Sequence, residues 1–127
     1  MVNISWGEAV EFADQMSIAD SSASYRLPTE AEWEYSCRCA TGGGWQGADD
    51  PDMVSRWAWF AGNTWDVGEP YPHEVGTLEE SPCGLHDIAG NVWEIVSDNF
   101  GPYSSSAEVD PLGPESDPLG HVVRGGS

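Results

Sequence analysis

The chain has 127 residues, enough for one domain with a modest core, and its seven tryptophans and 39% hydrophobic residues exclude a disordered acidic tail. The chain has 22 acidic residues, four arginines and no lysine. Its net charge of −18 disfavours binding to nucleic acids or anionic membranes. No apolar run approaches the roughly 20 residues of a membrane span, and Met1 leads into a polar, amphipathic segment unlike a signal peptide, so we expect a soluble chain.

The first predicted element is an amphipathic helix over residues 6–16. Ser5 and Glu8 have the spacing of a capping box, in which each side chain accepts a hydrogen bond from the main-chain N–H of the other. Apolar residues then recur at helical spacing as far as Met16. The small and polar residues at 17–24 predict a loop after this helix.

A second helix is predicted to begin after Pro28. Thr29 and Glu32 repeat the capping-box spacing. Glu34 and Arg38 stand four residues apart in the order that favours an ion pair on a helix surface. The helix should end in the glycine-rich loop that occupies residues 40–47.

The rest of the chain predicts short strands separated by long loops, because 15 glycines and 9 prolines interrupt regular structure. A short strand is expected near Trp59, a brief extended piece at 73–76, the best strand at 92–96 and a final strand at 121–124, with a loop at 99–120. Two helices, short strands and long loops together predict an α+β fold.

The three cysteines make an odd count. Cys37 and Cys39 are two residues apart on the predicted second helix, a spacing unsuited to a disulfide between them. Cys83 lies in a predicted loop. On the residues alone we expect three reduced, partly buried thiols.

Residues 84–95, which read GLHDIAGNVWEI, contain the most informative motif. Asp87 and Glu94 are seven residues apart, and Gly90 and Asn91 favour a tight reversal between them. Such a turn brings two carboxylates and several carbonyls to one point, and hard cations, above all Ca²⁺, prefer pockets made only of oxygen. The alternative is a turn followed by a strand, with both acids in solvent. The spacing alone does not separate the two interpretations.

Four segments in sequence order resemble the formylglycine-generating enzyme family, also called the sulfatase-modifying factor family. They read VNISWGEAVEF, YRLPTEAEWEYSCR, GLHDIAGNVWE and RGGS, and together they run from Val2 to Ser127. The resemblance implies the C-type-lectin-like fold of this family, rich in loops, with two helices and short strands. It also implies that residues 1–127 are the central part of a single domain, truncated at both ends.

The resemblance strengthens the calcium interpretation of the turn. It implies a structural Ca²⁺ held by side-chain and main-chain oxygens of four residues, Asp87, Gly90, Val92 and Glu94. A second, weaker calcium site is suggested by the polar residues of the GNTWD segment, Asn63, Thr64 and Asp66.

Enzymes of this family oxidise a substrate cysteine with O₂ and a Cu⁺ ion held by two cysteine thiolates, which are soft ligands suited to that ion. The resemblance places those two cysteines after the RGGS segment, where none of the three cysteines of this chain lies. It matches Trp93 and Ser127 to the rim of the active site. It also implies that Cys37 pairs, as in some members, with a cysteine beyond Ser127.

Two functions follow from this resemblance. In the first, the chain is a fragment of a longer protein that converts a sulfatase cysteine to formylglycine. The substrate would be a protein or peptide that contains a cysteine, and Cu⁺ would be bound only in that longer protein. The second is that of a non-catalytic, lectin-like module that binds a ligand or serves as an accessory domain. Because the copper ligands are absent, we expect residues 1–127 alone to be inactive as an oxidase.

Overall fold

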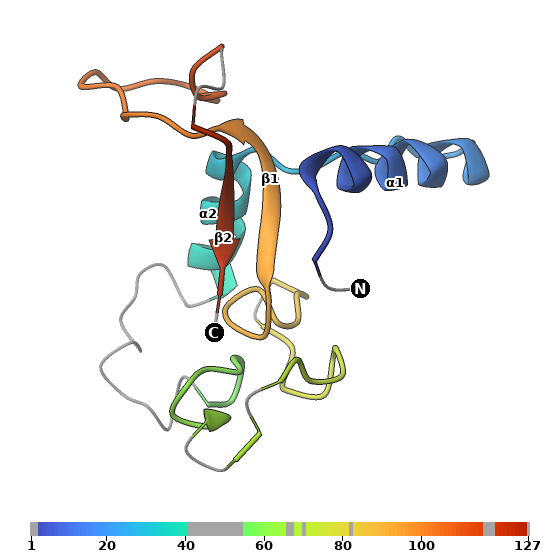
Figure 1. Ribbon diagram of the computed structural model, residues 1–127, viewed down its shortest axis with the longest axis vertical. Coiled ribbons are helices and arrows are strands. Elements are labelled where there is room, and N and C mark those ends of the chain that lie inside the picture. The colour runs from blue at the N-terminus through green and yellow to red at the C-terminus, as the bar shows by residue number, and fades with distance from the viewer. Residues whose placement is uncertain are drawn as a thin grey trace. The chain divides into compact units, whose positions relative to one another are not determined.

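The computed structural model describes residues 3–40, 55–65, 68–69, 71–81, 83–115 and 119–126. Along the chain it contains helix α1 (Trp6–Ala19), helix α2 (Glu30–Ala40), strand β1 (Trp93–Asn99) and strand β2 (His121–Gly125) (Figure 1). The two strands pair in opposite directions to form one two-stranded sheet. This arrangement confirms the predicted α+β class.

The chain divides into two compact units. The first consists of residues 1–32 and 95–123, and the second of residues 33–94 and 124–127. Helix α2 and both strands contribute residues to each unit. The described part of the chain has no helix long and apolar enough to cross a membrane.

Helix α1 begins at the predicted capping box. The Ser5 N–H donates to Glu8 Oε2 at 2.7 Å, and the Glu8 N–H donates to Ser5 Oγ at 3.3 Å. The helix continues to Ala19, beyond its predicted end at residue 16. The Ser17 hydroxyl donates to the Ala13 carbonyl at 3.1 Å, so this polar side chain is satisfied within the helix and does not end it.

The N-terminal end of α1 packs inside the first unit. The Trp6 indole donates to the Val96 carbonyl at 3.2 Å and stacks on the His121 ring, with 4.1 Å between ring centroids. Buried apolar side chains of this unit come from the helix and from both strands: Ala9, Ala13, Val96 and Val122. His121 therefore has a packing role here.

Helix α2 also begins as predicted. The Thr29 N–H donates to Glu32 Oε2 at 2.8 Å, and the Glu32 N–H donates to Thr29 Oγ1 at 3.1 Å. The Arg26 guanidinium contacts both carboxylate oxygens of Glu32 at 2.7 Å. The hydrogen bonds from Arg26, and then the one from the Thr29 N–H, lower the pKa of Glu32 to about 2. The predicted ion pair between Glu34 and Arg38 is present as well.

The strands differ from prediction mainly in where β1 ends. It extends to Asn99, three residues beyond the predicted end at residue 96 and into the first residue of the loop predicted at 99–120. The Ser97 N–H donates to the Pro28 carbonyl at 2.8 Å, and Asp98 Oδ2 accepts the Glu30 N–H at 2.8 Å. These distant partners hold polar residues in extended conformation, which a local pattern does not reveal.

Two shorter predictions are corrected. Residues 73–76 contain a turn and no strand, and the strand expected near Trp59 is a single bridge to Gly90. Most of the glycine-rich loop predicted at 40–47 lies outside the described residues. Strand β2 is confirmed and runs one residue further than predicted, to Gly125.

Candidate metal centre

The turn before β1 has the tight reversal that the sequence predicts. Asp87, Gly90 and Asn91 have positive φ angles of 53°, 87° and 61°, a region that Gly, Asn and Asp enter most readily. At Gly90 a Cβ atom would lie 2.0 Å from the Trp59 carbonyl oxygen, so only glycine fits. The Asn91 N–H donates to the same carbonyl at 2.9 Å.

The Asn91 side chain attaches this turn to the loop around His73. Its Oδ1 accepts the His73 N–H at 2.8 Å, and its Nδ2 donates to the His73 carbonyl at 3.2 Å. The His73 ring in turn stacks on Trp59 with 4.0 Å between centroids. Asn91 is buried, and its amide attaches the loop around His73 to the turn that contains Gly90. The sequence motif indicated a turn former here but not this second role.

Asp87 has one satisfied and one unsatisfied carboxylate oxygen. Its Oδ2 accepts the Gly76 N–H at 2.7 Å. Its Oδ1 is buried and has no hydrogen-bond partner. A carboxylate oxygen removed from water without a donor or a cation is costly, so this atom indicates a site for a positively charged partner.

Glu94 lies on β1 and is partly buried. Its Oε2 accepts a hydrogen bond from Trp33 Nε1 at 2.6 Å, and Trp33, on α2, is only 4% exposed. Burial raises the pKa of Glu94, the Asp87 charge acts in the same direction, and the Trp33 indole opposes both. The Asp87 contribution has the direction expected of two like charges, each of which disfavours ionisation of the other.

The two predicted carbonyl ligands belong to the same turn. The Gly90 oxygen accepts the Val92 N–H at 2.8 Å, and the Val92 oxygen accepts the Gly126 N–H at 3.2 Å. Each carbonyl retains a second lone pair. Nowhere in the described residues do three His, Cys, Asp or Glu side chains gather around one point. A cation here would use two carboxylates and main-chain oxygens, a donor set that fits Ca²⁺ better than a transition metal.

The chain matches a known domain over its full length. The family profile described as Sulfatase-modifying factor enzyme 1-like domain covers residues 1–127. The chain belongs to this family. The formylglycine-generating enzyme of Streptomyces coelicolor is 37% identical over 142 residues, which cover 100% of this chain and 41% of that protein. The predicted resemblance is thereby confirmed, and the chain spans less than half of this relative's length.

Two solved structures have a similar fold. Treponema denticola variable protein 1 has a TM-score of 0.65 and 35% sequence identity, over 80% of this chain and 36% of that one. PvdO from Pseudomonas aeruginosa has a TM-score of 0.67 over 97% of this chain and 48% of that one, at 23% identity. The second likeness concerns the fold alone.

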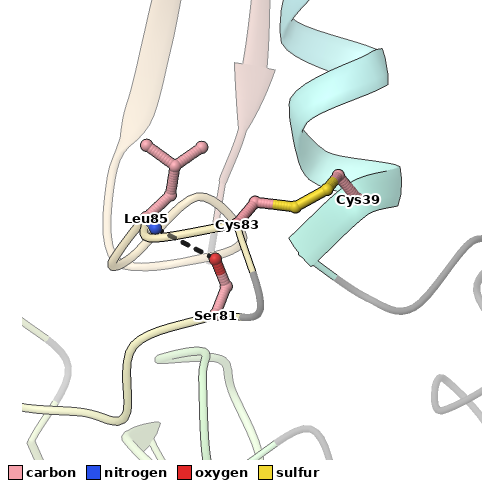
Figure 2. Close-up of a disulfide and its surroundings, with 4 residues drawn as sticks. All are labelled: Cys39, Ser81, Cys83 and Leu85. Atoms are coloured by element: carbon pink, nitrogen blue, oxygen red, sulfur yellow. Dashed lines mark hydrogen bonds between the residues drawn. A yellow bond between two sulfur atoms is a disulfide. The ribbon is translucent and has the colours of Figure 1, made fainter.

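In this sulfatase-modifying factor domain the cysteines differ from the prediction of three reduced thiols. Cys39, near the end of α2, forms a disulfide with Cys83, 44 residues later, with 6.1 Å between their Cα atoms (Figure 2). The fold brings together two residues whose proximity no local spacing indicates. Cys37 is buried and is not part of this disulfide, and burial raises the pKa of its thiol.

The residues suggested for a second calcium site have other partners in the described part of the domain. The Asn63 amide donates to the Ala58 carbonyl at 2.9 Å and accepts the Phe60 N–H at 2.8 Å. The Thr64 hydroxyl donates to the Phe60 carbonyl at 2.9 Å. Both side chains thus stabilise their own turn. Asp66, the third residue of this prediction, lies outside the described residues.

Of the two predicted rim residues, one is described. Trp93 is 66% exposed at the start of β1, and a Cβ atom at Gly126 would lie 3.0 Å from its ring. The ring therefore lies against the main chain of the RGGS segment and leaves much of its surface open. Ser127 lies outside the described residues.

Proposed function

We propose that residues 84–94 bind one Ca²⁺ ion that stabilises this sulfatase-modifying factor domain. The observation that carries the proposal is the buried Oδ1 of Asp87, which has no hydrogen-bond partner. A second carboxylate, that of the partly buried Glu94, follows the same turn. The carbonyls of Gly90 and Val92 complete the proposed ligand set. Bound there, the ion would supply positive charge that offsets the repulsion between the two acids. Its role would be structural.

Calorimetric titration with Ca²⁺ tests this proposal. We expect about one ion per folded chain, and at least a tenfold loss of affinity in Asp87→Asn, because the neutral amide keeps one oxygen but lacks the charge. Asp110→Asn is the matched control, since Asp110 is an exposed aspartate that also has a positive φ, of 49°. A folded chain that binds no Ca²⁺, or equal losses in the two variants, contradicts the proposal.

We further propose that a longer protein containing this domain oxidises a sulfatase cysteine to formylglycine. The support is the 37% identity with the Streptomyces coelicolor formylglycine-generating enzyme over the whole chain. The cysteines of this chain do not fit a copper pair, because Cys39 and Cys83 are joined to each other and Cys37 is buried with a raised pKa. No catalytic step is assigned to them.

A peptide-oxidation assay with added copper and O₂ tests this second proposal. Residues 1–127 alone should give no turnover, and clear turnover by them would overturn the assignment of the copper ligands to another segment. The protein encoded by the complete gene should oxidise a sulfatase peptide. A folded, copper-loaded form of that protein without turnover would overturn the oxidase function.

A ligand-binding module is the alternative function. Exposed aromatic residues on loops of the second unit, such as Trp65 and Tyr71, suit such a role. The gene sequence after Ser127 discriminates between the two functions. Two cysteines about five residues apart soon after the RGGS segment, as the family resemblance implies, favour the oxidase, and their absence favours the binding module.

A further inference from the structure

We propose that the Cys39–Cys83 disulfide positions the calcium turn, so that breaking it weakens cation binding. The inference rests on the calcium site proposed above. It makes that site sensitive to the redox state of the protein. It concerns two cysteines that belong neither to the proposed ligands nor to a copper pair.

The disulfide joins α2 to a segment that is closed by hydrogen bonds. Ser81, which is buried, accepts the Leu85 N–H on its Oγ at 3.0 Å, and its own N–H donates to the Leu85 carbonyl at 2.8 Å (Figure 2). The Gly84 N–H donates to the Ser81 carbonyl at 2.9 Å. Cys83 lies inside this closed loop, four residues before Asp87. A constraint on Cys83 is therefore transmitted towards the first proposed ligand.

The last proposed ligand is attached to the same helix. Trp33 of α2 donates its indole N–H to Glu94 at 2.6 Å. Trp33 and Cys39 are six residues apart on α2, which corresponds to about 9 Å along a helix axis. One end of the metal turn is thus fixed to α2 by a covalent bond and the other end by a hydrogen bond. The helix sets the separation between the two ends.

Two features of the turn between these attachments favour its opening when it is not held. Asp87, Gly90 and Asn91 all have left-handed main-chain conformations. The buried Oδ1 of Asp87 has no hydrogen-bond partner among the described residues, so closing the turn without a cation is costly. Without the disulfide, the segment before Asp87 is free to move away from α2. The cation would then have to reorder the turn, and its affinity would fall.

The coupling must be reciprocal. A dithiol reductant such as dithiothreitol donates two electrons and two protons to the disulfide, giving two thiols, Cys39 and Cys83, and the cyclic disulfide of the reductant. If reduction weakens Ca²⁺ binding by some factor, saturating Ca²⁺ must oppose reduction by the same factor. A tenfold change corresponds to about 30 mV in the two-electron reduction potential, which should become more negative with Ca²⁺.

The first experiment compares Ca²⁺ affinity in the oxidised chain, in the chain reduced with dithiothreitol and in the Cys39→Ser/Cys83→Ser variant. Reduction and the double substitution should each raise Kd about fivefold or more. The double variant should not respond to dithiothreitol. Cys37→Ser is the control for the third cysteine and should keep the affinity of the oxidised chain. Circular dichroism establishes that α1 and α2 persist in each sample.

The outcomes separate this inference from the calcium proposal. Equal affinity in the oxidised and reduced chains overturns the inference and leaves the calcium site in place. No binding by the folded, oxidised chain overturns the calcium site itself. If the double variant does not fold, the reduction potential of the native chain with and without Ca²⁺ decides. An unchanged potential overturns the inference, and a Ca²⁺-dependent shift that is lost in Asp87→Asn supports it.

Discussion

Replacing Trp33 with phenylalanine tests whether the buried indole holds the proposed calcium turn, residues 84–94, to α2. The substitution keeps an aromatic ring under the Arg124 guanidinium, whose carbon lies 5.1 Å from the indole ring centroid, but removes the donor to Glu94. A hydrogen bond to a charged group contributes about 1.5–3 kcal/mol. The partly buried Glu94 carboxylate would then lose its donor, so we expect a loss of about 2–3 kcal/mol in the free energy of unfolding.

Urea denaturation in the presence of a chelator measures this loss without interference from bound cation. The matched control is Trp65→Phe, the same substitution at a side chain that is 64% exposed, where the change should stay within about 0.5 kcal/mol. Because the indole hydrogen bond lowers the pKa of Glu94, that pKa should rise further in Trp33→Phe. A loss below about 0.5 kcal/mol for Trp33→Phe, or equal losses in both variants, would refute this role for the indole.

Three further predictions concern the turn and the start of α2. Gly90→Ala should destabilise the domain by about 2 kcal/mol or more, because its Cβ would meet the Trp59 carbonyl oxygen at 2.0 Å, and an unchanged denaturation midpoint would contradict this. Asn91→Ala should speed hydrogen exchange of the His73 amide, because the Asn91 Oδ1 accepts a hydrogen bond from that N–H. Unaltered exchange would show that Asn91 does not hold the His73 loop to the turn. The pKa of Glu32 is lowered to about 2 from 4.5, so its contribution to stability is present above pH 4.5 and is lost as pH falls towards 2. Glu32→Gln should flatten this part of the pH–stability curve. The change in the free energy of unfolding should be less than about 1 kcal/mol, because the Arg26–Glu32 ion pair is exposed. A curve identical to that of the unchanged chain would contradict the prediction.

The features predicted correctly are those that depend on local sequence. Both capping boxes formed, because Ser5 and Thr29 need only a glutamate three residues later to complete the pair of hydrogen bonds. The reversal at Gly90 and Asn91 formed, because these residue types tolerate positive φ. The α+β class followed from such local signals. The family assignment came from short specific strings in the right order, and the family profile that confirms it covers residues 1–127.

The features that were missed depend on residues far apart in the chain. Trp33 and Glu94 are 61 residues apart, and no periodicity links the helix motif to the metal turn. Cys39 and Cys83 are 44 residues apart, so an odd count of cysteines gave no indication of which two would pair. The predicted strand ended at residue 96, two residues before Asp98, because the partner of Asp98, the Glu30 N–H, lies 68 residues away. Long-range contacts decide these cases, and local patterns do not encode them.

The central claim is that Asp87 and Glu94 share a Ca²⁺ ion, and thermal unfolding with and without a chelator tests it most directly. At a hundredfold excess over Kd, a bound ion stabilises the folded state by about 2.7 kcal/mol. Chelation should therefore lower the melting temperature, and added Ca²⁺ should restore it. Glu94→Gln should reduce this response without abolishing it, because the amide keeps one oxygen. A cooperatively folded chain whose melting temperature changes with neither chelator nor Ca²⁺ would contradict the claim.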